Sequence, residues 1–196
     1  MINIYLESKS NKTPEYVFVR TLLLHIGVSP ELFSIIPING KDSLHKAKNQ
    51  FIQNTLEGGL NLIIFDADTP DNNGGHAVRR LEIENTLARL GIESDIFLFP
   101  NNQDDGDFES LLEELALKDR HQAFFGCFND YEMCLGNDYV HPNRKGKLHA
   151  YITSMKMSGM KRRNIGSGEW LFDNPDYWNL DAEYLLPLKQ FLLSRF

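Results

Sequence analysis

Short apolar runs alternate with amphipathic stretches along the first half of the chain. Each run is rich in branched or aromatic side chains and is bounded by turn residues, a pattern typical of buried strands in a parallel sheet. The predicted strands span residues 2–7, 33–38, 60–66 and 95–99. Apolar residues at helical spacing between them predict helices over residues 14–26, 43–56 and 76–90.

Strands that alternate with helices imply an α/β fold with a parallel sheet and right-handed crossovers. If the first strand lies centrally beside the third, the strand order is 2-1-3-4. The first helix is expected to start at Thr13 and Pro14 and to end at Gly27. The inward faces expected for the next two helices comprise Leu44, Ala47, Phe51, Ile52 and Leu56, and then Val78, Leu81, Leu87 and Leu90.

The chain beyond the fourth strand is predicted to be mainly helical. The predicted helices cover residues 110–117, 119–136, 146–157 and 181–195. A loop rich in Gly, Asn and Asp precedes the last of them, and no clear linker marks a boundary. We therefore expect a sheet domain over residues 1–117 and a helical C-terminal extension over 118–196 that packs on it.

The composition is that of an ordinary globular protein, since 42% of the 196 residues are hydrophobic and 24% are charged. No apolar stretch approaches the roughly 20 residues of a membrane span, and the N-terminus does not resemble a signal peptide. Cys127 and Cys134 imply no disulfide framework. We therefore expect a cytoplasmic protein without a membrane partner. The sequence defines no oligomeric state, and a homodimer is compatible with it.

Acidic residues close two of the predicted strands. Glu7 ends the first strand, and Asp66 and Asp68 end the third, where strand alternation would place both aspartates on one side. In an open α/β sheet, ligands gather outside the carboxyl ends of strands where the strand order reverses. Carboxylates this close repel one another unless a cation lies between them, and such oxygen ligands suit Mg²⁺ or Mn²⁺. We expect these three side chains to form a metal site, with a solvated strand end and an exposed turn as the alternatives.

More acidic residues follow the fourth strand. Asp104, Asp105, Asp107 and Glu109 lie before or at the start of the next predicted helix. Asp105, Asp107 and Glu109 are candidate ligands for a second metal ion, which would clamp the attacking and leaving oxygens of a phosphodiester. For Asp107 and Glu109 an equally good explanation is that acids in a first helical turn interact favourably with the helix dipole.

Charge is distributed unevenly along the chain. The net charge of −7 argues against a generic nucleic-acid binder, because phosphate affinity comes largely from Lys and Arg. Residues 141–165, however, contain no Asp or Glu. The basic side chains expected to guide a polyanion towards the crevice are Arg144, Lys145, Lys147, Lys161, Arg162 and Arg163. A solvated loop is an alternative for the last three.

The acidic strand ends resemble a known domain. A glutamate after strand one and an Asp-x-Asp after strand three, in this β/α order, are similar to the Toprim domain of topoisomerases, bacterial primases and nucleases of the overcoming-lysogenization-defect family. The resemblance covers about residues 1–117. It implies Mg²⁺-dependent phosphodiester chemistry on nucleic acid, with Asp66 and Asp68 as metal ligands and Glu7 in acid–base catalysis or metal binding.

Other segments resemble a narrower family. Residues 98–102 and 107–112 are similar to a small family of Toprim-like bacterial proteins. Residues 177–181 resemble the C-terminal segment of that family more loosely. This resemblance implies the same fold and adds no further site residue.

Two other functions stay open. Ser8 stands where Toprim domains commonly have glycine, and Pro70 stands where many carry a third acid. These departures favour a binding or regulatory module that has the fold without turnover. Residues 66–69 also fit the opening motif of haloacid-dehalogenase-type phosphatases, in which Asp66 would be the nucleophile. That family needs a downstream lysine, and residues 69–103 contain none.

Overall fold

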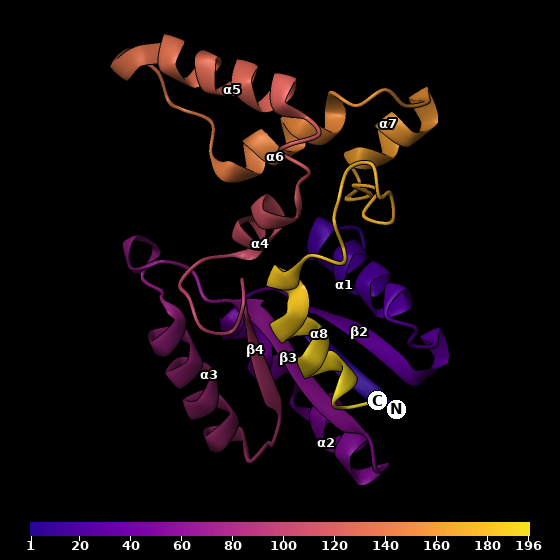
Figure 1. Cartoon of the computed structure of the whole chain (residues 1–196). Helices are drawn as coiled ribbons and strands as arrows, with labels where there is room; N and C mark the ends of the chain where they lie inside the picture. Colours follow the sequence, from indigo (N-terminus) through magenta and orange to yellow (C-terminus); the bar gives the residue numbers. More distant parts are fainter.

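A parallel four-stranded sheet forms the centre of the protein (Figure 1). The structure is a computed structural model and describes all 196 residues. The strands are β1 (Ile2–Glu7), β2 (Phe33–Ile38), β3 (Leu60–Asp66) and β4 (Asp95–Phe99). They lie in the order β2-β1-β3-β4, so the predicted α/β fold and strand order 2-1-3-4 are confirmed. Their bounds match the apolar runs, because a strand covered on both faces needs apolar side chains on both.

The register brings the two acidic strand ends to one edge of the sheet. Leu6 pairs with Ile64 across β1 and β3, and Asp66 pairs with Phe99 across β3 and β4. Glu7 therefore follows directly after the last β1–β3 pair and stands beside the end of β3. The strand order reverses between β1 and β3, so this edge is the kind of crevice in which α/β proteins bind ligands.

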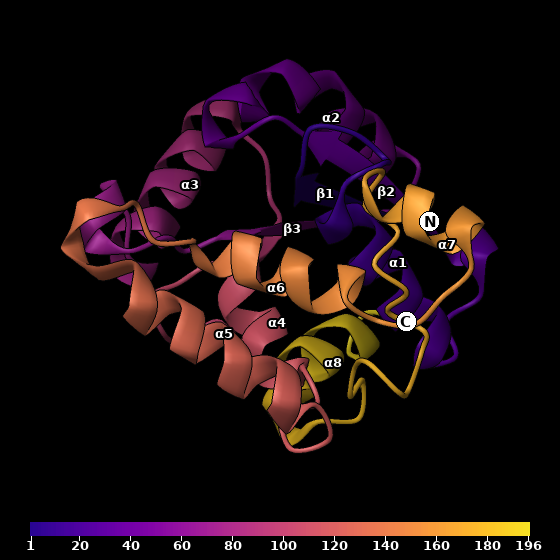
Figure 2. The same cartoon turned by 90° about the horizontal axis from the view of Figure 1, so that it is seen from above.

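Helices cover both faces of the sheet (Figures 1 and 2). On one face, Phe51 and Ile83 pack in one hydrophobic cluster with Tyr5 of β1. On the other face, Phe18 and Leu188 share a second cluster with Ile4 and other strand residues. The helices that provide these contacts are α2 (Lys48–Leu56) and α3 (His76–Leu90) on the first face, and α1 (Pro14–His25) and α8 (Leu186–Leu193) on the second.

The predicted inward faces of α2 and α3 are only partly correct. Ile52 and Leu56 are exposed, since α2 buries Phe51 together with a polar residue, Asn54. The Asn54 side chain donates hydrogen bonds to the carbonyl of Leu60 and to the side chain of Asn61, and these bonds hold α2 to the start of β3.

In α3 the buried residues are Arg79, Ile83 and Leu87, which are spaced by four. Val78 and Leu81 fall outside this stripe, so they are exposed and their prediction was wrong. The segment before α2 forms a 3-10 helix where an α-helix was expected. The 3-10 helices are η1 (Pro30–Leu32), η2 (Lys41–Ala47), η3 (Pro70–Asn72), η4 (Gly136–Asp138) and η5 (Glu183–Leu185).

The four helices that directly follow β4 form a layer beyond the carboxyl edge of the sheet. Figure 2 views the molecule from this side, with α5, α6 and α7 in front of the sheet. Their bounds are α4 (Phe108–Leu115), α5 (Gln122–Leu135), α6 (Arg144–Thr153) and α7 (Gly159–Ile165). The sequence pattern did not predict α7, because its seven residues include a single buried one, Ile165.

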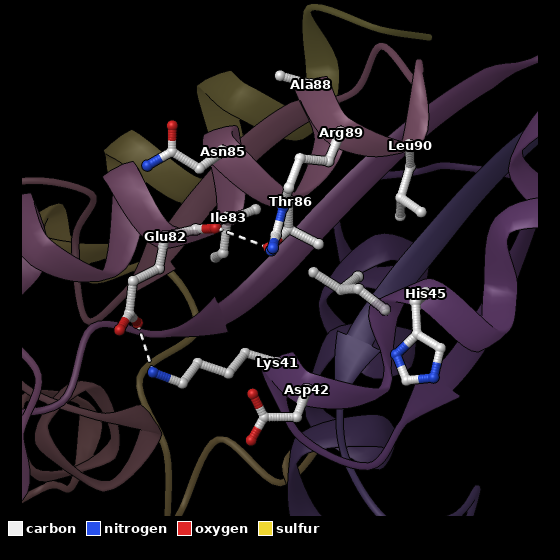
Figure 3. A pocket seen from close by; sticks show the side chains of 11 residues that line it. Lys41, Asp42, His45, Glu82, Ile83, Asn85, Thr86, Ala88, Arg89 and Leu90 are labelled. Atoms are coloured by element: carbon white, nitrogen blue, oxygen red, sulfur yellow. Dashed lines mark hydrogen bonds and ion pairs between the residues drawn. The ribbon is translucent and has the colours of Figure 1, made fainter.

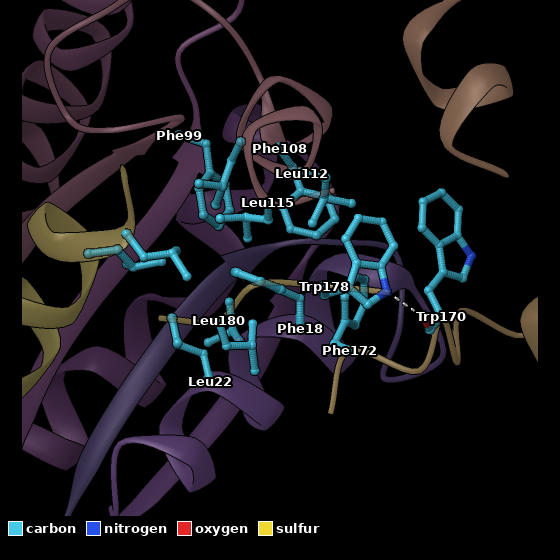
Figure 4. Close-up of a cluster of buried hydrophobic side chains, with 14 of the residues drawn as sticks. Phe18, Leu22, Phe99, Phe108, Leu112, Leu115, Trp170, Phe172, Trp178 and Leu180 are labelled. Atoms are coloured by element: carbon cyan, nitrogen blue, oxygen red, sulfur yellow. Dashed lines mark hydrogen bonds between the residues drawn. The ribbon is translucent and has the colours of Figure 1, made fainter. Parts of the chain in front are cut away.

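The C-terminal extension shares a hydrophobic core with the sheet domain (Figure 4). Phe172 makes edge contacts with Phe18 of α1 and Phe108 of α4. Trp178 packs on Phe172, and its indole N–H donates to the carbonyl of Trp170 across 2.9 Å. Aromatic side chains from both segments therefore stabilise one continuous core. No helix has the length and apolar character that a membrane crossing requires.

Candidate functional site

A cavity of about 550 Å³ opens at the carboxyl ends of β1 and β3. Glu7 and Asp66 line it from the sheet. The loop after β1 contributes Lys9 and Lys12, and α6 contributes Lys145. The cavity therefore joins acidic side chains at the end of the sheet with basic side chains on its walls.

Hydrogen bonds fix one oxygen of each carboxyl group. The backbone N–H of Asp66 donates to Oε2 of Glu7 across 3.2 Å. The backbone N–H of Phe108, the first residue of α4, donates to Oδ1 of Asp66 across 2.9 Å. The second oxygen of each carboxyl accepts no hydrogen bond from the protein. Glu7 and Asp66 thus lie side by side with spare ligand capacity.

The two carboxyl groups are held in an environment that disfavours negative charge. Burial raises the pKa of Asp66 well above its ordinary value, and the charges of Glu7, Glu109, Asp107 and Asp68 raise it further. Burial also raises the pKa of Glu7, although the hydrogen bond from Asp66 and the charge of Arg79 oppose that rise. A cation at this point would relieve the repulsion and restore both charges.

Asp68 lies close enough to this pair for its charge to raise the pKa of both carboxyl groups, but its own contacts are made elsewhere. Its side chain forms an ion pair with Arg79 of α3, and it does not line the cavity. The chain leaves the extended conformation after Asp66, and the φ angle of Asp68 is +60°, so strand alternation no longer applies. The structure places Glu7 and Asp66 on the wall of the cavity, and Asp68 beside them with its carboxylate bound to Arg79.

The residues present fit a Mg²⁺ or Mn²⁺ ion that keeps much of its water. No group of three or more His, Cys, Asp or Glu side chains is arranged to hold a metal ion. Mg²⁺ is commonly bound by one or two carboxylates together with water and substrate phosphate oxygens. Glu7 and Asp66 provide such a pair, and burial raises the pKa of both.

The other predicted acidic ligands have structural contacts. Asp105 accepts the backbone N–H of His76 across 2.6 Å at the start of α3. Asp107 is the N-cap of α4 and forms a capping box with Ser110. Glu109 forms an ion pair with Lys145 across 2.7 Å. Asp107 and Glu109 act on the site through their charge, since both raise the pKa of Asp66.

The basic residues of α6 face acidic residues of α4. Arg144 binds Glu113 across 3.0 Å and Asp107 across 3.3 Å. Lys147 lies 3.7 Å from Glu113, and Lys145 contacts Glu109. Of the three, Lys145 alone lines the cavity.

The basic residues of α7 lie apart from these. Arg162 donates to the carbonyls of Thr153 and Met155 near the end of α6. Lys161 and Arg163 are exposed and form no ion pair. The structure therefore does not gather the six predicted basic residues around one ligand.

Sequence reasoning missed several residues that line the cavity or support it. Lys9 and Lys12 line the wall nearest β1, and His149 lines it from α6. The signal that could have found the two lysines is their place in the loop directly after Glu7. Arg79 could have been noticed in the sequence, because it lies four residues before Ile83 and eight before Leu87. These three residues share one face of the helix, and that face is buried.

A second, larger cavity lies between η2 and α3 (Figure 3). Its volume is about 920 Å³, and Lys41, His45, Glu82 and Arg89 are among the residues that line it. Neither Glu7 nor Asp66 reaches it. We therefore place the candidate chemistry in the smaller cavity, where unsatisfied carboxylate oxygens and lysines meet.

Comparisons of the chain with protein families, with curated proteins and with solved structures gave no match.

Proposed function

We propose that the protein carries out Mg²⁺-dependent phosphodiester chemistry on nucleic acid, most simply hydrolysis. The observation that carries the proposal is the contact between Glu7 and Asp66 in a cavity with lysines on its walls. Paired carboxylates bind a hard cation, and lysines bind phosphate. The β2-β1-β3-β4 order and the Toprim-like placement of these two acids support the same function.

Glu7 and Asp66 would hold the ion through their carboxyl oxygens. When bound, Mg²⁺ or Mn²⁺ would neutralise phosphate charge and help to activate water. Glu7 also fits a role in proton transfer as a general base, because a bound cation would keep it ionised and one of its oxygens accepts no hydrogen bond from the protein. The hydrogen bond from the Asp66 backbone orients the Glu7 carboxyl towards that role.

The lysines would bind the phosphates of the substrate. Lys9 and Lys12 approach from the loop after β1, and Lys145 approaches from α6. A cavity of about 550 Å³ lies within the range of small-ligand pockets, roughly 300–1,000 Å³. This size favours a nucleotide-length segment of a single strand over the body of a duplex.

A nuclease assay on single-stranded DNA and RNA, with Mg²⁺ or Mn²⁺ present, tests the proposal. We expect cleavage that EDTA abolishes and that Asp66→Asn and Glu7→Gln each remove. Asp71→Asn, a change at an exposed residue of η3, is the matched control and should keep full activity. Turnover of para-nitrophenyl phosphate with a beryllofluoride adduct on Asp66 would instead support an aspartyl-phosphate mechanism.

A binding or regulatory module is the second candidate. It is favoured by Lys9, Lys12 and Lys145, which can bind phosphate without a metal ion, and by the lack of a ready three-ligand metal group. This function predicts that a fluorescent single-stranded oligonucleotide binds with unchanged affinity in EDTA. It also predicts that no cleavage follows when Mg²⁺ is added.

A further inference from the structure

Arg79 is a buried arginine whose charge faces the second aspartate of residues 66–68. Only 7% of its side chain is exposed. Nη2 forms an ion pair with Asp68, Nη1 donates to Glu82 across 2.9 Å, and Nε is buried without a partner. A guanidinium does not lose its proton in proteins, so this positive charge is permanent.

The backbone holds Asp68 in place towards Arg79. The carbonyl of Asp68 accepts the N–H of Gly106 across 2.8 Å, within an isolated bridge between the two segments. A Cβ at Gly74 would collide with the Cβ of Asp68, so the loop before α3 packs closely against it. Lys41 in turn binds Glu82 across 2.5 Å, which steadies the other partner of Arg79.

This arrangement resembles a two-metal site in which an arginine side chain replaces one of the two metal ions. In two-metal enzymes, ions about 3.5–4 Å apart are held by neighbouring carboxylates. Here the position against the Asp68 carboxylate is taken by the Arg79 guanidinium. An ion that bound Asp68 would displace this contact and leave a buried arginine with Glu82 as its remaining partner, which is unfavourable.

We propose that Arg79 takes the place of a second metal ion at Asp68, so that the site binds one divalent ion through Glu7 and Asp66. The inference rests on the metal site of the proposed function. Arg79 is then a positioning residue that supplies fixed positive charge, and Asp68 anchors it. The proposal distinguishes the two aspartates, which the Asp-x-Asp pattern alone treats as equivalent.

Calorimetric titration of the full chain with Mn²⁺ alone tests the stoichiometry. We expect one ion for the wild type and for Asp68→Asn, with dissociation constants that agree within about threefold, whereas Asp66→Asn should weaken binding at least about tenfold. Arg79→Met should gain a second ion through the uncompensated Asp68. The double variant Asp68→Asn/Arg79→Met should return to one ion. Electron paramagnetic resonance should show isolated Mn²⁺ in the wild type and coupled Mn²⁺ in Arg79→Met.

Three results would overturn the inference alone: two ions in the wild type, a single ion in a folded Arg79→Met, or a loss of affinity in Asp68→Asn as large as that in Asp66→Asn. Absence of any Mn²⁺ binding by the wild type would refute the metal site of the proposed function and the inference with it. Circular dichroism checks that each variant folds. If Arg79→Met does not fold, the comparison between Asp68→Asn and Asp66→Asn decides the question.

Discussion

The backbone N–H of Asp66 donates to Oε2 of Glu7 and joins two strand ends that are 59 residues apart in the chain. The contact holds one carboxyl group next to another in a partly buried position. Because two like charges are close together here, their repulsion destabilises the folded protein unless a proton or a cation binds. The first two predictions follow from this repulsion.

Replacement of Asp66 by asparagine should stabilise the metal-free protein at neutral and alkaline pH. The folded-state pKa of Asp66 is raised well above its ordinary value, so the folded state binds the proton more tightly than the unfolded chain. This stabilising protonation is lost as pH rises through the folded pKa. In EDTA, we expect Asp66→Asn to raise Tm at about pH 8 by a few degrees, where roughly 2–4 °C corresponds to 1 kcal/mol. The difference should shrink towards about pH 4, near the ordinary pKa of Asp. Asp71→Asn should show neither effect.

Divalent ions should stabilise the wild type more than Asp66→Asn. A ligand present at 100 times its dissociation constant adds about 2.7 kcal/mol to the free energy of unfolding. Thermal melts in a Mn²⁺ series should therefore show a rising Tm for the wild type, and EDTA should reverse it. An equal rise in Asp66→Asn would place the binding site elsewhere.

Glu7→Gln should remove activity while it preserves the fold. The amide oxygen can still accept the N–H of Asp66, so the contact between the strand ends is kept. Loss of the ionisable group should lower kcat by about 10²–10⁴, the usual contribution of a general acid or base. Glu31→Gln, at an exposed position in η1, should leave kcat unchanged. Steady-state cleavage kinetics and a melting curve check both variants.

Lys145→Met should weaken nucleic-acid binding more than it affects stability. Lys145 lines the cavity and its side chain is 52% exposed, whereas Glu15 and Glu109 are 16% and 12% exposed, so its loss should lower stability measurably in a melting curve but leave the protein folded. One lost phosphate contact reduces the slope of log K against log salt concentration by about 0.7 for a single strand. Fluorescence anisotropy at several salt concentrations measures the slope. Lys118→Met, outside the cavity, should leave the slope intact.

Phe172→Ala should destabilise the sheet domain and the extension together. Phe172 is buried against Phe18, Phe108 and Trp178, so truncation should cost about 3–5 kcal/mol. Phe196→Ala removes a ring that is 42% exposed and should have little effect. Chemical denaturation monitored by Trp fluorescence and by circular dichroism should give one coincident transition. Two separate transitions would mean that the extension unfolds on its own.

The pattern of apolar residues predicted the sheet correctly, because few structures other than a buried strand fit apolar runs of this length. Asp66 ends β3 and Glu7 ends β1 as expected, and Leu87 of α3 is buried. Val78 and Leu81 were misplaced because helical spacing alone cannot show which stripe faces the sheet. The buried stripe of α3 also contains Arg79, which forms an ion pair with Asp68, and hydrophobicity does not predict a buried arginine.

The sequence could predict that Glu7 and Asp66 lie together, but not that Asp68 lies outside the cavity. Strand ends that meet at a reversal of strand order are visible in sequence, and Glu7 with Asp66 follows from them. The orientation of the Asp68 side chain depends on a left-handed backbone conformation at this non-glycine residue. The pattern of apolar and polar residues does not indicate such a conformation. The ion pairs of Lys145 and Arg144 with α4 depend on how the extension folds back, and this is long-range information.

Both ends of the chain lie at the edge of the sheet opposite to the cavity (Figure 1). The carbonyl of Met1 accepts the N–H of Leu60 at the start of β3, and Arg195 binds Asp95 at the start of β4 across 3.1 Å. An affinity tag, a fluorophore or a surface linkage attached at either end would therefore sit about one strand length, roughly 20 Å, from Glu7 and Asp66. Immobilised protein would present its cavity to the solution, which suits a single-molecule test of whether the cavity captures an oligonucleotide.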